Sequence, residues 1–198
     1  REEGSGIVAD ETTPLLQSKD PNFRPVDIKF GPDGALYVVD WYDPIIQHGE
    51  QGFRDPLRDH TRGRIWRITY KGKAPLKTVD LTQLGTLQLL DQLKVYEDRE
   101  RYRARVRLGE LPENEVLPAL QQWLSALDKK DSAYDYHRLE GLWLHQQFHQ
   151  PDEALLASLL GSSDPHIRAA ATRVLYYWAD HIKGAQEKLA ALAVDAAP

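Results

Sequence analysis

Arginines, aspartates and histidines are concentrated in one short stretch, HGEQGFRDPLRDHTRGRIWRITY, at positions 48–70. From residue 54 to residue 73 the chain carries seven Lys and Arg residues against two acids, Asp55 and Asp59. Guanidinium groups bind carboxylates through paired hydrogen bonds, carboxylates can ligate a cation, and an imidazole can move a proton near neutral pH. This stretch is therefore the first candidate for a functional site.

The rest of the composition limits the classes of function. The formal net charge is −5 and the pI is about 5.8, which argues against general nucleic-acid binding because that function needs a basic face. The chain has no cysteine, so it contains no disulfide, no thiolate metal site and no covalently attached c-type haem. No apolar run approaches the roughly 20 residues needed to cross a bilayer, so we expect no membrane span.

Short strands must position the charged stretch. VDIKF at 26–30 alternates apolar and polar residues, which predicts a half-buried strand. GPDG at 31–34 predicts a tight turn, and the continuously apolar ALYVVDW that follows predicts a strand buried on both faces. GRIWRITY at 63–70 alternates again. The first 80 residues are thus expected to form an antiparallel meander.

The expected hairpin brings the charged residues together. Because its two strands enter and leave at the same end, residues 20–25 should lie beside the long loop 41–62. A loop of about 20 residues without structure of its own is usually functional in a compact domain. We refer to the predicted site as the candidate rim, and its members are Arg24, Asp40, Trp41, Asp43, His48, Arg54, Arg58, Asp59, His60 and Arg62.

Three chemical interpretations of the candidate rim are open. A carboxylate of a substrate or quinone could be clamped by Arg54, Arg58, Arg62 and Arg64. They could instead pair with Asp43, Asp55 and Asp59 and fix the shape of the loop, which is the interpretation that we favour. The acids could bind Ca²⁺, but arginines between them compete for the same oxygens. His60 as a general base is a further candidate role. The sequence identifies no catalytic residue.

From about residue 81 the apolar period changes to that of helices. In DPHIRAAATRVLYYWADHI, Asp164 is the expected N-cap, Pro165 the first helical residue, and the apolar residues fall on one stripe. Arg103, Arg138 and Arg168 recur at spacings of 35 and 30 residues, which favours a HEAT-type helical solenoid over an irregular bundle. The predicted fold class is α+β, with a β domain at 1–80 and α-helical repeats at 81–198.

Other residues that could do chemistry are in the helical half. His145 and His149 are one helical turn apart and could bind a metal, with His137 nearby, but a surface pair is the favoured interpretation. Trp66, Trp123, Trp143 and Trp178 are expected to fill cores, whereas Trp41 is placed on the candidate rim.

Three strands bury too little to form an independent domain. Either SGIVAD at 5–10 adds a strand, or further sheet comes from sequence outside this chain. The chain begins with Arg1, contains no Met and has no leader, which suggests an internal segment of a longer polypeptide.

At this point a family resemblance becomes visible. DPNFRPVDIKFGPDGALYVVDWYDPIIQHG, RDPLRDHTRGRIWRITYKG, YHRLEGLWLHQ and SSDPHIRAAATRVL resemble membrane-bound dehydrogenases that carry a haem-binding domain. Members join a glucose/sorbosone-dehydrogenase-like β-propeller to HEAT repeats and often to a c-type cytochrome. The chain departs from the family's loop pattern at Tyr42 and Arg62, where the family has His, and at Gly49-Glu50-Gln51, where it has Met-Gln-His.

The resemblance implies that residues 1–80 end a propeller with its last blade and that 81–198 are HEAT repeats. The parent protein would be a periplasmic or extracellular sugar or alcohol dehydrogenase, with pyrroloquinoline quinone and Ca²⁺ in its propeller. It would pass electrons to haem c in a further domain. No cofactor is assigned to this chain itself, and its expected partner is the rest of the parent polypeptide.

A second function class is equally open. Degenerate propellers and helical solenoids both present large surfaces, so the chain could be a non-catalytic module that binds a protein partner on its helices. Whether the chain belongs to an enzyme is left undecided by the sequence.

Overall fold

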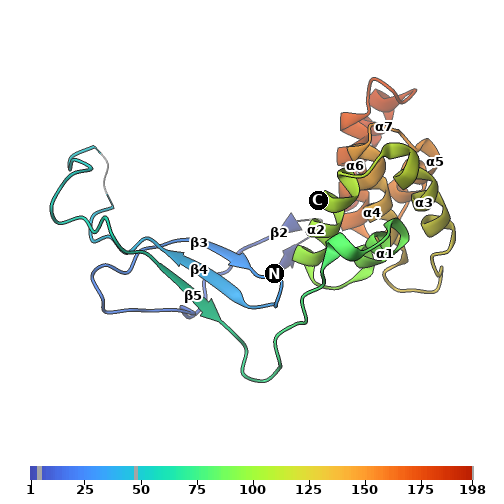
Figure 1. Cartoon of the computed structure of the whole chain (residues 1–198). Helices are drawn as coiled ribbons and strands as arrows, with labels where there is room; N and C mark the ends of the chain where they lie inside the picture. Colours follow the sequence, from blue (N-terminus) through green and yellow to red (C-terminus); the bar gives the residue numbers. More distant parts are fainter. Residues whose placement is uncertain (4–5, 47–48, 198) are drawn as a thin grey trace. The chain divides into compact units, whose positions relative to one another are not determined.

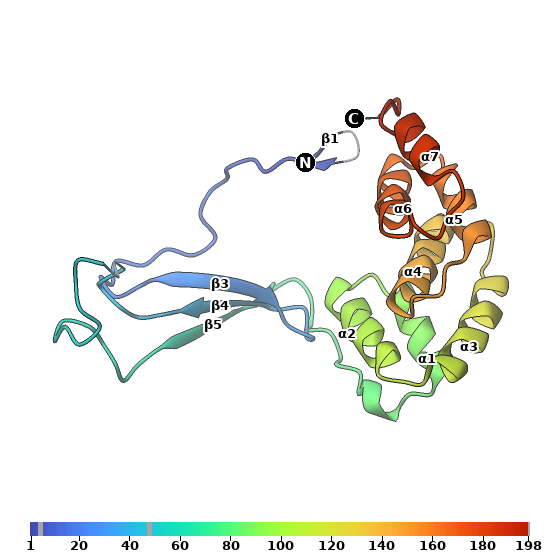
Figure 2. The same ribbon diagram turned by 90° about the horizontal axis from the view of Figure 1, so that it is seen from above.

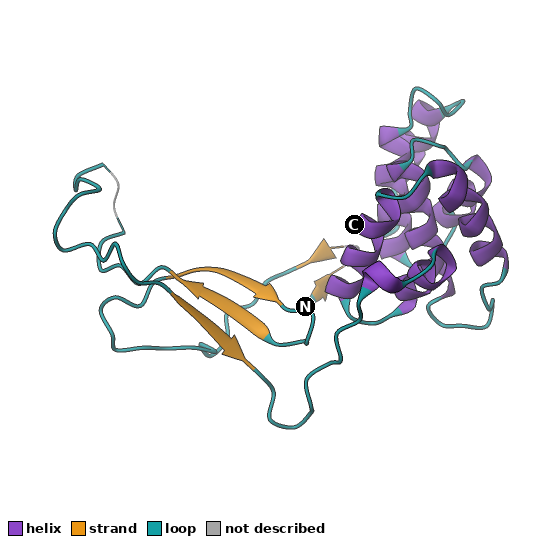
Figure 3. Ribbon diagram, in the orientation of Figure 1, coloured by secondary structure: helices purple, strands orange, loops and turns teal. Residues whose placement is uncertain are grey.

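A computed structural model describes residues 1–3, 6–46 and 49–197 (Figure 1). The chain divides into two compact units. We call Thr12–Val79 the sheet unit, and Asp80–Pro198, with which Arg1–Glu11 are grouped, the helical unit. The sequence predicted a boundary between residues 80 and 81. Strands lie in the first part of the chain and helices in the last, so the fold is of the α+β class (Figure 3).

The sheet unit contains three antiparallel strands in the order β3-β4-β5, where β3 is Pro25–Phe30, β4 is Leu36–Asp40 and β5 is Arg64–Ile68. The predicted meander is confirmed. The turn between β3 and β4 is closed by the Gly34 amide, which donates to the Gly31 carbonyl at 3.0 Å. Gly34 has φ 74°, a backbone conformation that glycine adopts without steric cost.

Two short strands precede this sheet and pair only with each other. They are β1, Glu2–Glu3, and β2, Gly6–Ile7. The stretch 5–10 therefore supplies a strand, but within the described residues that strand does not extend the three-stranded sheet.

Burial of the sheet differs from the prediction. β3 was expected to be half buried, yet all six of its residues are exposed, with Ile28 at 59%. β4 was expected to be buried on both faces, yet Val38 is buried and Val39 is 39% exposed. The alternation is present in the strand, but within the described residues nothing packs over the apolar side of β3. The alternation of apolar and polar residues indicates which side of β3 is apolar, but it does not identify the part of the protein that covers that side.

The helical unit contains two 3₁₀ turns and seven α-helices among the described residues (Figure 2). The 3₁₀ turns are η1, Leu81–Gln83, and η2, Gln92–Lys94. The α-helices are α1, Thr86–Asp91; α2, Asp98–Gly109; α3, Glu113–Ser125; α4, Tyr134–Gln147; α5, Glu153–Leu160; α6, Pro165–Tyr177; and α7, Ala185–Leu192. The predicted cap is confirmed, since Asp164 accepts a hydrogen bond from the His166 amide and Pro165 begins α6.

The helices α2, α4 and α6 pack in succession, because α2 contacts α4 and α4 contacts α6, while α1 contacts both α2 and α3. A cluster of buried residues from α4 to α7 forms the largest part of the core, including Leu142, Leu159, Ala171, Leu175 and Trp178. Trp123 is also buried, so the core role predicted for Trp123 and Trp178 is confirmed.

A repeated pattern runs through α2, α4 and α6. The eleventh residue of each helix is Leu108, Leu144 or Leu175, and all three are fully buried. The seventh residue is also fully buried in each helix, and it is Ala104, Glu140 or Ala171. Two alanines and one glutamate therefore occupy equivalent core positions.

The fourth residue of each of these helices is basic or titratable: Arg101, His137 and Arg168. Nη1 of Arg101 donates to the Val95 and Tyr96 carbonyls, and Nη1 of Arg168 donates to the Ser162 and Ser163 carbonyls. Each arginine thus turns back to the residues six and five positions before it. The predicted alignment of Arg103 and Arg138 with Arg168 is wrong by helix position, because loops of different length precede the three helices.

Candidate functional site

The loop between β4 and β5, residues 41–62, contains most of the predicted candidate rim, and Asp40 at the end of β4 is its first anchor. The Asp40 side chain is buried and accepts hydrogen bonds from the amides of Arg24 and Tyr42 at 2.8 and 3.1 Å. It also accepts from Nε of Arg64 at 2.8 Å and from Nε1 of Trp66 at 2.9 Å. Burial alone would raise the pKa of Asp40, but these four donors outweigh it and lower that pKa below its ordinary value.

Arg64 connects this anchor to the segment that enters the sheet. Its Nη1 lies 2.7 Å from Oδ2 of Asp20, while its guanidinium covers the Tyr42 ring at 4.1 Å from the ring centroid. Tyr42 has φ 60°, a left-handed conformation that is unfavourable for a bulky residue. The hydrogen bond from the Tyr42 backbone amide to Asp40 and the stacked guanidinium of Arg64 hold Tyr42 in this conformation. The sequence-based rim omitted Arg64, although Arg64 is the residue paired with Asp40 across β4 and β5.

Arg58 is the second anchor and is itself buried in the loop. Its Nη1 lies 3.3 Å from Oδ2 of Asp43, and both side chains are only 3% exposed. The guanidinium also donates to the carbonyls of Ile45, Gln51 and Gly52. One cation therefore joins both sides of the loop, which fixes its shape.

Arg24 bonds to its own segment and to the loop, and Asp59 bonds within the loop. Arg24 donates to the Phe23 carbonyl at 2.7 Å and to the Pro44 carbonyl at 3.2 Å. Asp59 accepts from the Thr61 amide and hydroxyl, and its Oδ2 lies 2.8 Å from Nε of Arg62. The Thr61 amide is the largest of the causes that lower the pKa of Asp59.

The remaining predicted rim residues are on the surface. Arg54, His60 and Arg62 are exposed, and Trp41 is 36% exposed. His48 lies outside the described residues. The structure thus brings Arg24, Asp40, Asp43 and Arg58 into internal contacts and leaves Trp41, Arg54, His60 and Arg62 facing solvent.

This geometry favours internal pairing over a substrate clamp for the buried members of the candidate rim. A carboxylate clamp needs guanidinium donors directed at an open space, whereas those of Arg58 are directed at loop carbonyls and Asp43. Among the described residues no group of three His, Cys, Asp or Glu side chains converges as a metal site. The carboxylates of Asp40, Asp43 and Asp59 are already bonded to arginines and amides.

The helical unit contains a buried charge that the sequence analysis missed. Glu140 is fully buried, and its carboxylate lies 2.6 and 2.9 Å from Nη1 of Arg105 and 3.4 Å from Nε of Arg101. Burial raises the pKa of Glu140, and the two arginines act against that shift. The available signal was a glutamate within an apolar stripe, at the position occupied by alanine in α2 and α6.

The histidines of the helical unit do not form the predicted surface pair. His145 is buried, with Nδ1 at 3.0 Å from the Gln150 carbonyl, whereas His149 lies beyond the end of α4 with φ 55°. The helix ends between them, so the one-turn spacing does not apply. His137 is also buried, and burial lowers its pKa.

Comparisons with known proteins add one finding. Residues 2–72 match a family described as a domain of unknown function, DUF7133, and this match includes all five strands and the loop 41–62. Searches of curated proteins and of solved structures found no match. None of the helices described is long and apolar enough to cross a membrane.

Proposed function

We propose that this chain is a non-catalytic interaction module, in which the sheet unit is one blade of a larger β-propeller and the helical unit is a HEAT-like solenoid. One observation carries the proposal. The charged groups at the loop end of the sheet are bonded to one another, whereas its apolar side chains are exposed. Val26, Ile28 and Phe30 of β3 are each more than half exposed, and Ile65 of β5 is 70% exposed.

The strand register places these residues on opposite faces of the sheet. Ile28 faces the same side as its partner Val38, and Trp66 lies beyond Val38 on β5. Val39 and its partner Ile65 face the other side. The face of Ile28 is apolar along β3, whereas the face of Val39 and Ile65 also carries Asp27, Lys29 and Arg67. An exposed apolar sheet face is typical of a sheet that packs against a further layer. A propeller blade has such a neighbour on each face.

The helical unit supports the second half of the proposal. Equivalent buried positions recur in α2, α4 and α6, and each helix packs on the next. Stacked helical hairpins with a repeated core present extended surfaces to partners. The observed repeat therefore favours a solenoid over an irregular bundle.

The sheet half of the proposal is tested with Ile28→Asp in this chain and in a longer polypeptide that contains it. In the isolated chain Ile28 is exposed, so the free energy of unfolding should change by less than about 1 kcal/mol. If position 28 is covered in the longer protein, Ile28→Asp places a carboxylate in a buried site. The melting temperature of the longer protein should then fall by several degrees. Leu15→Asp, at a position that is 70% exposed and lies outside the three strands, is the control. An unchanged melting temperature in the longer protein would contradict the blade assignment.

A second candidate function is the sugar or alcohol dehydrogenase implied by the family resemblance. The observation that favours it is the group of exposed polar residues on the loop, Arg54, His60 and Arg62, of which only Arg62 belongs to an ion pair described above. The activity, a periplasmic location and an attached cytochrome would belong to the parent protein. Turnover of a panel of sugars by the full-length protein with pyrroloquinoline quinone and Ca²⁺ tests it, and the absence of both turnover and quinone binding would reject it.

A further inference from the structure

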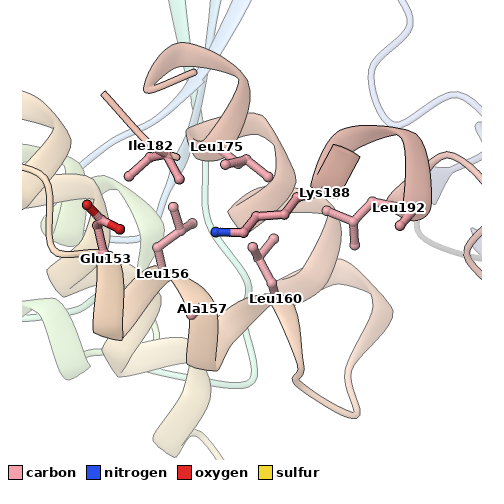
Figure 4. A pocket seen from close by; sticks show the side chains of 9 residues that line it. Glu153, Leu156, Ala157, Leu160, Leu175, Ile182, Lys188 and Leu192 are labelled. Carbon is pink, nitrogen blue, oxygen red and sulfur yellow. The ribbon is translucent and has the colours of Figure 1, made fainter. Parts of the chain in front are cut away.

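The helical unit has an apolar pocket of about 300 Å³ between α5, α6 and α7 (Figure 4). Its walls come from one stripe of α5 and one of α7, with Leu156, Ala157 and Leu160 facing Ala191 and Leu192. Two charged groups also line it, Glu153 and Lys188. Within the described part of the chain neither has an ion-pair partner. The pocket is therefore an apolar recess lined by one acidic and one basic residue that have no ion-pair partner among the described residues.

The sheet unit carries exposed apolar side chains that could enter such a pocket. Besides Trp41, three large apolar side chains of the loop 41–62 are exposed: Ile46 at 61%, Phe53 at 66% and Leu57 at 70%. Arg54 and Asp55 directly follow Phe53, and neither forms an ion pair within the described residues. We call Ile46, Phe53, Arg54, Asp55 and Leu57 the loop crown.

Arg58 orders the backbone of the loop crown before any partner binds. Its bonds to the carbonyls of Ile45 and Gly52 fix the backbone next to Ile46 and Phe53. Ordering an interfacial segment costs free energy, and a segment that is already ordered avoids that cost. A rigid aromatic residue on such a segment is a frequent binding anchor.

Charge also favours contact between these two surfaces. The sheet unit contains eleven Lys and Arg residues against eight Asp and Glu, whereas residues 80–198 contain thirteen against eighteen. The sheet unit is thus net basic and the helical unit net acidic, so the sheet unit of one molecule is attracted to the helical unit of another. In a contact between the loop crown and the pocket, Arg54 can form an ion pair with Glu153, and Asp55 can form one with Lys188.

From these observations we infer that the chain self-associates, with the loop crown of one copy inserting Phe53 into the α5–α7 pocket of a second copy. The contact joins two different surfaces, so it is heterologous, and it produces either closed rings or open chains of copies. It deepens the proposed interaction role by naming a partner. It uses the loop and the helical unit, whereas the blade assignment concerns the faces of the sheet, so the two can fail separately.

Sedimentation velocity on the full chain over a concentration series tests the inference. The wild-type chain should show a mass that rises with concentration. Phe53→Asp should weaken self-association by more than about tenfold, as expected for loss of an aromatic anchor. Ala157→Trp should do the same by filling the pocket from an exposed position. Leu15→Asp and Ala154→Trp alter exposed residues outside both surfaces and should leave the association unchanged.

Mixing the two defective variants gives the decisive result. Phe53→Asp keeps an intact pocket and Ala157→Trp keeps an intact loop crown, so a mixture can form one complete contact. Each variant alone should be a monomer, and the equimolar mixture should form a one-to-one dimer. Circular dichroism establishes that both variants remain folded. A monomeric wild-type chain at all concentrations, or a mixture that stays monomeric, would overturn the inference.

Discussion

The two units of this chain use buried charge in different ways. In the sheet unit Asp40 and Arg58 hold irregular backbone, because most of their partners are amides and carbonyls of the loop and its neighbouring segments. In the helical unit Glu140 joins one helix to another through the side chains of Arg101 and Arg105. A loop lacks the repeating backbone bonds of a helix, so side chains must satisfy its polar groups. Helices satisfy their own, so a buried charge between them specifies which helix packs on which.

The apolar side chains show the same contrast. The helical unit buries its large aliphatic residues completely at positions such as Leu142, Leu159 and Leu175, whereas the sheet unit leaves Ile28 and Ile65 exposed. Stability of the isolated chain should therefore come mainly from the helical unit, and substitutions in the two units should differ in size.

The largest effect is expected from Leu175→Ala. This residue is fully buried in the core of the helical unit, and truncation should lower the free energy of unfolding by about 2–5 kcal/mol, through lost burial and the cavity that remains. Ile28→Ala, the matched change in the sheet unit, should cost less than about 1 kcal/mol because Ile28 is already exposed. Urea denaturation followed by helical circular dichroism measures the loss in the helical unit, and amide hydrogen exchange of the strands measures the loss in the sheet unit. Equal losses would contradict the contrast between the units.

Glu140→Ala should be the next most disruptive substitution, at about 3 kcal/mol, because Arg105 and Arg101 lose their buried carboxylate. Alanine suits the space itself, as Ala104 and Ala171 show at the equivalent positions. Removing the cation as well should therefore recover part of the loss, so Glu140→Ala with Arg105→Ala should cost less than the sum of the single changes.

A double-mutant cycle by denaturant unfolding measures this coupling. Glu110→Gln serves as the control, since Glu110 forms an exposed pair with Arg107 at 2.9 Å and should contribute at most about 1 kcal/mol. Strict additivity of Glu140→Ala and Arg105→Ala would show that the pair does not connect α2 and α4.

Asp40→Asn should lower the stability of the sheet unit by about 1–3 kcal/mol, because the amide group cannot accept all the hydrogen bonds that the carboxylate accepts. Tyr42 should then lose its left-handed conformation, and hydrogen exchange of the amides in residues 41–62 should accelerate. Asp27→Asn is the control on the exposed face, and its exchange rates should match those of the wild type. Unchanged loop protection in Asp40→Asn would remove Asp40 from its anchoring role.

Acidification should produce the smallest effect, with opposite signs at Asp40 and at Glu140. The pKa of Asp40 is lower in the folded chain than in the unfolded chain, so its contribution is complete above the unfolded value of about 3.9 and disappears as the pH falls through the lower folded value. The pKa of Glu140 is raised by burial, so its charged form costs stability at higher pH and protonation relieves that cost as the pH falls.

Acidification from neutral pH to about pH 3 should therefore weaken the Asp40 anchor of the sheet unit, and it should relieve the cost of burying Glu140 in the helical unit. Loop amide exchange reports on the first effect and unfolding followed by helical circular dichroism on the second. Asp40→Asn should reduce the acid sensitivity of the loop, and Glu140→Gln should remove the favourable contribution of acid at this position. Acid responses identical to those of the wild type in both variants would disagree with the directions of the two pKa shifts.

Local sequence was sufficient for the elements of this protein. The alternation in 26–30 and 63–70, the GPDG turn and the Asp164–Pro165 helix start each depend on neighbouring residues, and all were predicted correctly. Backbone preference and side-chain period act over a few residues, so a single sequence contains that information.

Tertiary structure decided the roles of the charged residues. Asp40 pairs with Arg64, 24 positions away, and Glu140 pairs with Arg105, 35 positions away. No local pattern identifies such partners, because they depend on strand register and on which helix packs against which. The loop sequence favoured internal pairing of its charges over a ligand clamp, and only the fold showed which of its members pair. What covers the apolar faces of the sheet likewise depends on packing rather than on period.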